Sequence, residues 1–183
     1  MEFKTRIAKL EDIPVIQGLM YQSITKLLGH YVNEGELEAS FESMGLDDQL
    51  IKDKTYILIY FEEILVGCGG WSNRKTLFGG NHTPNRSDDF LDPNNDAAKI
   101  RAMYTNPEWA RKGVGTLILE LAEKEAFNSG FKKCELMATL SGIHLYKKRG
   151  YKIDEQIMYK SKKGNKVKMF KMTKLLKLKN TNE

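Results

Sequence analysis

Few residues of this chain are of the kinds that bind metals or form disulfides. Cysteine occurs at two positions and histidine at three in a chain of 183 residues. Cys68 and Cys134 lie far apart, each inside an apolar, strand-like run, so we expect two reduced, buried thiols and neither a disulfide nor a nucleophile. The histidines, His30, His82 and His144, have no spacing that would put two of them on one helical face. We therefore expect no metal site and no disulfide framework.

Long apolar runs are also missing. No stretch reaches the roughly 18 consecutive apolar residues of a membrane span, and residues 1–13 lack the apolar core of a signal peptide. The composition, 41% hydrophobic and 29% charged, is that of a globular protein. We expect a cytoplasmic protein with a single domain over residues 1–183.

Acidic residues are scarce in the last part of the chain. Residues 146–183 hold 13 Lys and Arg against 3 Asp and Glu, which leaves a net charge of −5 for residues 1–145 out of the total of +5. A basic segment of this kind could bind nucleic acid. Here the charges alternate with apolar residues and no recognition motif accompanies them, so solvated strand and helix faces are the favoured reading and nucleic acid is an unlikely partner.

Apolar periodicity and turn residues divide the chain into alternating strands and helices. The predicted strands are 3–10, 55–62, 64–72, 98–105, 132–139, 151–161 and 166–176. The predicted helices are 13–28, 33–46, 116–128 and 141–150. Hairpins mixed with helical crossovers predict an α+β fold, with a mixed, mostly antiparallel, twisted sheet of about seven strands and helices on both faces.

A long loop is predicted at about 72–97. It has little periodicity, and a connection of this length inside one domain is usually either functional or disordered. We expect it to form part of an acceptor pocket if it is ordered. Trp71 and Phe78, at and beyond its start, are expected to pack in the core.

Residues 106–120, NPEWARKGVGTLILE, place two cations and two glycines where a helix begins. They are not a Walker loop, because Gly115 is followed by Thr116 and not by Lys, and a dinucleotide fingerprint would need glycine at Ile118. The first turn of a helix nevertheless presents unpaired amides and the positive end of the helix dipole, which favour an anion such as a pyrophosphate. A glycine-rich turn needed only for packing is the alternative.

Two segments resemble the motifs of the GNAT superfamily of acetyl-CoA dependent N-acetyltransferases. Its phosphate motif, [RQ]-x-x-G-x-[GA], falls on residues 110–115, with alanine in the first place and Arg111 next to it. A second motif, N-x-x-A-x-x-[FL]-Y-x-x-x-G-[FY], falls on residues 139–151 with Tyr146, Gly150 and Tyr151 in register. The motif's Asn is Thr139 here. The two motifs stand in the order, and in the elements, that this superfamily uses.

This resemblance implies a central sheet of the GNAT type and acetyl-CoA as the co-substrate. The pyrophosphate would bind the amides of residues 112–116, and the pantetheine arm would follow the strand that ends at Thr105. The cofactor-binding residues implied in this way are Met103, Tyr104, Thr105, Arg111, Lys112, Gly113, Val114, Gly115, Thr116 and Thr139.

The resemblance also implies transfer of the acetyl group to a primary amine of an unidentified, small substrate by direct attack. Tyr146 would be the general acid, since a phenol with a pKa near 10 is protonated where a thiolate with a pKa near 8.5 departs. A core role for Tyr146 is the alternative. The strand 98–105 offers no carboxylate or imidazole as base, which leaves Glu34, Asp96, His82 or water.

Tyr31 and Glu34, in the connection between the first two helices, are the predicted substrate residues. A non-catalytic acyl-CoA binding or sensing module is the alternative function, because it would need the anion site and no base. An exposed sheet edge would support a homodimer.

Overall fold

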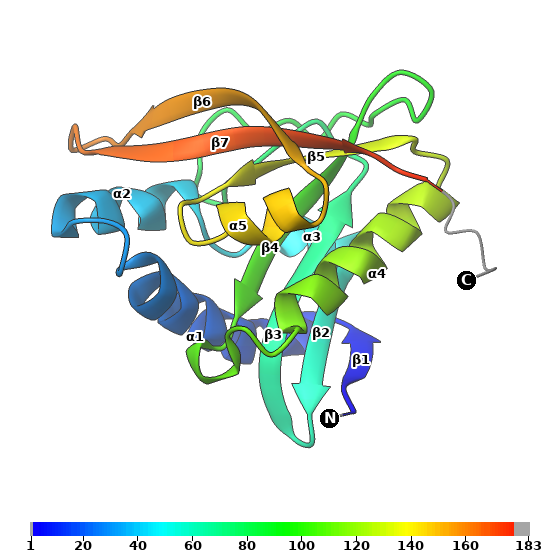
Figure 1. Ribbon diagram of the computed structural model, residues 1–183, viewed down its shortest axis with the longest axis horizontal. Coiled ribbons are helices and arrows are strands. Elements are labelled where there is room, and N and C mark those ends of the chain that lie inside the picture. Colours follow the sequence, from blue (N-terminus) through cyan, green and yellow to red (C-terminus); the bar gives the residue numbers. More distant parts are fainter. Residues whose placement is uncertain (1, 178–183) are drawn as a thin grey trace.

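A seven-stranded sheet forms the centre of the molecule (Figure 1). The structure is a computed structural model that describes residues 2–177. The strands are β1 (Lys4–Ile7), β2 (Tyr56–Phe61), β3 (Ile64–Ser72), β4 (Ala98–Thr105), β5 (Lys133–Ala138), β6 (Lys152–Lys160) and β7 (Lys166–Leu175). The helices are α1 (Ile13–Ser23), α2 (Glu34–Ser43), α3 (Asp48–Lys52), α4 (Val114–Asn128) and α5 (Ile143–Lys148). No helix among residues 2–177 is long and apolar enough to cross a membrane.

The strand order across the sheet is β1-β2-β3-β4-β5-β7-β6. Within residues 2–177, β4 and β5 are the only parallel neighbours, and they pair only at Ala98 with Cys134 and at Lys99 with Glu135. Beyond these residues the two strands diverge. The prediction of a mixed, mostly antiparallel sheet of about seven strands is confirmed.

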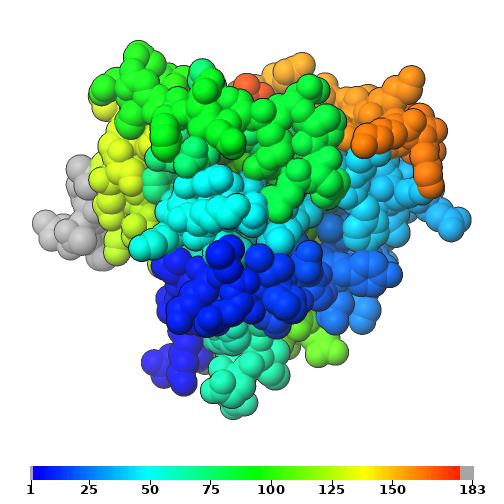
Figure 2. All heavy atoms as spheres, turned by 180° about the vertical axis from the view of Figure 1, so that it is seen from behind, coloured from blue at the N-terminus to red at the C-terminus, as the bar shows by residue number. Residues whose placement is uncertain are grey.

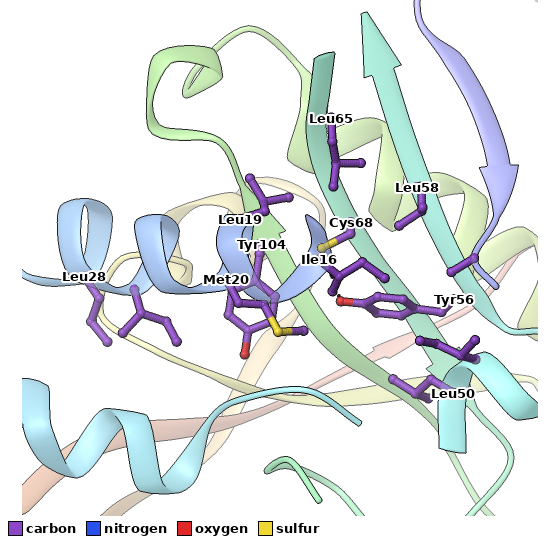
Figure 3. Packing of buried hydrophobic residues seen from close by; sticks show 13 residues of the cluster. Ile16, Leu19, Met20, Leu28, Leu50, Tyr56, Leu58, Leu65, Cys68 and Tyr104 are labelled. Carbon is purple, nitrogen blue, oxygen red and sulfur yellow. Dashed lines mark hydrogen bonds between the residues drawn. The ribbon is translucent and has the colours of Figure 1, made fainter. Parts of the chain in front are cut away.

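Helices cover both faces of the sheet because successive strand residues point to opposite sides. Tyr56 and Leu58 of β2 pack with α1 and α3, while Ile57 and Ile59 between them pack with Val114 of α4 and its neighbours. Figure 3 shows the first of these two cores, with the apolar side of α1 directed onto β2, β3 and β4. The predicted placement of helices on the two faces is confirmed.

Some helix boundaries differ from the predicted ones. The first helix changes to a π-helical turn over Ile24–Leu28, and the short helix α3 was not predicted. Helix α4 begins at Val114, two residues earlier than expected. Short or irregular helices carry too few periods for a sequence pattern to reveal.

The predicted long loop is an ordered connection. Its two ends run alongside one another, with Leu91 N donating to Asn73 O at 2.7 Å and Lys75 N donating to Asp89 O at 3.0 Å. Figure 2 shows this connection, in green, spread over the same side of the molecule as α1 and α3. Trp71 is buried and meets Phe131 edge to face at 5.9 Å, so the prediction that it packs in the core is confirmed.

Candidate active site

The turn between β4 and α4 has the backbone shape of an anion site. Arg111 and Gly113 have φ angles of 64° and 89°, and Gly113 caps the start of the helix. The first helical bond runs from Leu117 N to Gly113 O at 3.0 Å. The amides of residues 113–116 precede it and have no acceptor in the helix, which is the arrangement that favours a bound anion. The Lys112 amide, which was also predicted to bind the pyrophosphate, donates instead to Trp109 O at 3.4 Å.

The two glycines of this turn serve different purposes. A Cβ at Gly113 would meet no atom beyond its chain neighbours within 4 Å, so the space beside its Cα is open, and its positive φ is what requires glycine. A Cβ at Gly115 would lie 3.0 Å from Leu145 Cδ2. Gly115 therefore has a packing role as well, because it lets the start of α4 approach α5.

The side chains of the turn are placed unequally. Arg111 and Lys112 are exposed, and Lys112 Nζ lies 4.8 Å from the ring centroid of Trp109, a cation–π contact. Val114 is buried in the core between α4 and the sheet, so its side chain is not available to a ligand and only its amide is. Thr116 is partly buried in the first turn of α4.

A bulge in β4 turns the strand at the point where β5 leaves it. The register with β3 shifts between Cys68 and Gly70, and Ala102 opposite has a φ of 49°, a left-handed conformation that is uncommon for a residue with a Cβ. The buried Tyr56 hydroxyl donates to Ala102 O at 2.8 Å. This hydrogen bond holds the strained residue in place.

The end of β4 was predicted to bind the cofactor arm. Some of its polar groups already form hydrogen bonds within the protein. The Tyr104 side chain points into the core, where its hydroxyl accepts from Gly45 N at 3.1 Å. The Thr105 amide donates to Ser23 Oγ at 3.4 Å, a long hydrogen bond. On the β5 side, residues 100–105 have no strand partner within the described chain, so this edge is open.

A cavity lies beside this open edge. It encloses about 590 Å³, including the part open to solvent. Its walls come from residues 43–45 after α2, residues 77–79 of the long connection, residues 100–104 of β4, residues of β5 up to Thr139, and Tyr146 and Met169. The structure thus brings Met103, Tyr104, Thr139 and Tyr146 together in one cavity wall. It also places Phe78 in the cavity wall, where a core position was expected.

Tyr146 and Met103 meet inside the cavity. The Tyr146 hydroxyl donates to Met103 Sδ at 3.6 Å, and the ring lies 5.9 Å from that of Tyr151, edge to face. Burial raises the pKa of Tyr146 to about 12. The phenol therefore keeps its proton at neutral pH.

The predicted substrate and base residues lie elsewhere. Tyr31 is 48% exposed and Glu34 is exposed, and neither lines the cavity. His82 and Asp96 are also absent from its described walls. Their roles remain predictions. No group of three His, Cys, Asp or Glu side chains among residues 2–177 is placed to hold a metal ion.

The sequence reading missed a buried ionic network behind the cavity. Arg101 Nη2 donates to Asp47 Oδ2 at 2.8 Å, and Arg86 Nη2 donates to Asp47 Oδ1 at 2.7 Å. Arg101 also donates to the carbonyl oxygens of Thr76 and Gly79, each at 2.7 Å. An arginine in the middle of the apolar run 98–105 was the available signal, since a buried charge requires a partner.

Comparison with known protein families and structures identifies the family to which this fold belongs. The model of the acetyltransferase (GNAT) family matches residues 21–151. No curated protein sequence matches the chain.

Several solved structures share the fold. A GCN5-related N-acetyltransferase from Rhodopseudomonas palustris is similar at a TM-score of 0.71 and 19% identity, covering 96% of this chain and 97% of that one. PaiA N-acetyltransferase from Thermoplasma acidophilum, in complex with coenzyme A, is similar at 0.61 and 17%, covering 96% and 100%. YncA of Salmonella typhimurium, a putative acetyltransferase with its cofactor acetyl-CoA, is similar at 0.64 and 13%, covering 97% and 95%.

The family model covers well over half of the residues, and both the turn before α4 and the helix that carries Tyr146 lie within the matched range. This chain belongs to the acetyltransferase (GNAT) family.

Proposed function

We propose that this acetyltransferase moves the acetyl group of acetyl-CoA to a primary amine of a small substrate by direct attack, with Tyr146 as the general acid. One observation carries the proposal: the anion turn at 111–116 and the cavity holding Tyr146 both border the open edge of β4. A long ligand with a diphosphate at one end and a thioester at the other fits such an edge.

The residues of the turn fit the diphosphate. Gly113 has no side chain that would hold phosphate oxygens away, and the amides of residues 113–116 are directed toward the N-terminal end of α4. Arg111 and Lys112 add two exposed positive charges. The coenzyme A and acetyl-CoA complexes of the two similar proteins support this assignment.

The bulged strand and α5 would hold the rest of the ligand. Backbone groups of Met103 to Thr105 would pair with the amides of the pantetheine arm, and the Thr139 hydroxyl, 3.1 Å from Ser141 Oγ, stands across the gap on the β5 side. Acetyl-CoA supplies a thioester carbonyl for the amine to attack and a thiolate that leaves.

The reaction needs a proton donor for the departing sulfur and an acceptor for the proton of the amine. The raised pKa of Tyr146 keeps a proton available for the departing sulfur. No carboxylate or imidazole belongs to the described walls of the cavity. We therefore assign the proton of the attacking amine to water, and the neutral amine is the reactive form.

Release of free thiol from acetyl-CoA, measured over a panel of primary amines, tests the proposal. We expect thiol release that depends on both the enzyme and an amine, with acetylated amine as the product in equal amount. Binding of acetyl-CoA without turnover of any amine would contradict the proposal and favour the acyl-CoA sensor. The exposed Tyr21, changed to Phe, provides a control for effects of losing a tyrosine hydroxyl.

A further inference from the structure

Part of the cavity wall is formed by apolar side chains from segments far apart in the sequence. Met44 follows α2, Leu77 and Phe78 belong to the long connection, Met137 lies on β5 and Met169 lies on β7. Phe78 is only partly buried and meets the Tyr159 ring edge to face at 6.1 Å. Methionine side chains around an aromatic ring adapt their shape to apolar groups. This wall suits the carbon body of a substrate.

Positive charge on such a body would find no partner in the wall. Arg101 is the one formally charged residue among the described residues that line the cavity, and it is positive. Its guanidinium is already paired with Asp47 and with two carbonyl oxygens. A second ammonium group buried here would lose its hydration without gaining a carboxylate, which is costly.

The carboxylate nearest in sequence to the wall at Ser43 is already engaged. Glu42 accepts hydrogen bonds from the Tyr159 hydroxyl at 2.8 Å and from Lys162 N at 3.1 Å. The Tyr159 hydroxyl and the Lys162 amide hold the pKa of Glu42 below its usual range, so it stays a paired anion. Glu42 therefore serves to fix the β6–β7 hairpin against α2.

The wall is also held in place. Arg101 binds the carbonyl oxygens on both sides of Phe78, those of Thr76 and Gly79, and Arg86 Nη1 donates to Gly80 O at 3.1 Å. Thr83 Oγ1 donates to Glu42 O at 3.0 Å, which ties the same connection to α2. The backbone that carries Phe78 is therefore fixed before the substrate arrives, which lowers the entropic cost of binding, while the methionine side chains can still adapt.

We propose that the acceptor is a primary amine on an apolar body, aromatic or branched aliphatic, with no second positive charge, and that Phe78 selects it. The inference rests on the proposed function, because it assigns the same cavity to the acceptor. On this inference, polyamines and other polycations bind weakly and are poor acceptors.

Equilibrium titration of the protein, with and without saturating coenzyme A, tests the inference with two probes. These are 2-phenylethylamine, which has an aromatic body and one amine, and butane-1,4-diamine, which carries a second positive charge. We expect 2-phenylethylamine to bind at least about tenfold more tightly. Phe78→Ala should weaken its binding by about tenfold or more. Met158→Ala, at an exposed residue of β6 outside the cavity, should leave the binding unchanged.

A variant that places a negative charge in the wall tests directly whether the wall selects against a second positive charge on the amine. Phe78→Glu should lower affinity for 2-phenylethylamine and raise affinity for the diamine, with thermal unfolding used to show that each variant is folded. Equal or tighter binding of the diamine by the unmodified protein, no binding of either amine, or an unaltered affinity in Phe78→Ala would each overturn the inference.

Failure of the inference can be told apart from failure of the proposed function. Thiol release with the diamine as the best acceptor would leave acetyl transfer standing and remove the selection. Absence of acetyl-CoA binding would remove acetyl transfer, while the titrations without coenzyme A would still report on the wall.

Discussion

Tyr146 is the residue on which the proposed chemistry depends. The sequence motif identified it, and the structure places its hydroxyl against Met103 Sδ at the open edge of β4. Tyr146 is partly buried and its hydroxyl has only a sulfur atom, a weak acceptor, as its partner. The hydroxyl carries its proton at neutral pH and is free to turn toward a departing thiolate.

Removing that hydroxyl tests the acid. Tyr146→Phe keeps the ring that packs against Tyr151 and removes the proton donor. We expect kcat to fall by about 100-fold or more, in the range that general acid catalysis contributes, with little change in the affinity for acetyl-CoA. Steady-state kinetics and an acetyl-CoA titration measure the two quantities. An unchanged kcat would remove the role, and Tyr21→Phe serves as the matched control.

The raised pKa of Tyr146 determines how kcat/KM should depend on pH. Because burial raises the pKa of Tyr146 to about 12, the acid form persists through the range in which amine substrates lose their protons. We expect kcat/KM to rise between pH 6 and about 10 as the amine becomes neutral, with no falling limb from Tyr146 in that range. A falling limb that is present in the unmodified enzyme and absent from Tyr146→Phe would contradict this account.

At the scale of elements, two short backbone irregularities prepare the site. The turn before α4 places residues 111 and 113 at positive φ, and the bulge in β4 does the same at Ala102. The sequence revealed the first, because glycines and cations stood at a helix start. It concealed the second, because nothing about alanine in an apolar strand indicates a left-handed conformation.

The turn can be tested with a matched pair of glycine substitutions. Gly113 and Gly164 have φ angles of 89° and 88°, and a Cβ at either would meet no atom within 4 Å. Both changes to Ala should cost about 1 kcal/mol of stability from backbone strain. Only Gly113→Ala should weaken acetyl-CoA binding, because the strained residue lies in the turn that presents the amides to the diphosphate. Equal affinities in the two variants would contradict a diphosphate site at this turn.

The bulge can be tested through Tyr56. Tyr56→Phe removes the hydroxyl that donates to Ala102 O, so a buried carbonyl at a strained residue loses its partner. We expect the free energy of unfolding to fall by about 1–3 kcal/mol, measured with urea, and kcat to fall as the β4 edge relaxes. A variant that is less stable but has an unchanged kcat would limit Tyr56 to a structural role.

For the whole molecule, the sequence predicted the seven strands, their mostly antiparallel arrangement and helices on both faces. Those features follow from local apolar periodicity, which a single sequence contains. It did not predict α3, the order of residues 73–97 or the network around Asp47, because these depend on contacts between distant segments. Arg101, Asp47 and Arg86 come together only when the sheet, the segment before α3 and the long connection are assembled.

Breaking that network should therefore affect the long connection more than the sheet. Asp47→Ala leaves the buried Arg101 and the neighbouring Arg86 without their carboxylate, and we expect a loss of about 3–5 kcal/mol in the free energy of unfolding. Hydrogen exchange should increase first in residues 76–86. Lys75→Ala, which breaks the exposed pair with Asp89, should cost far less. Equal costs would show that the network does not hold the wall.

Calorimetric titration of the protein with acetyl-CoA tests the central claim most directly. The account predicts saturable binding with one molecule per chain, weakened in Gly113→Ala and unchanged in Gly164→Ala. The absence of any binding by the unmodified protein would contradict it.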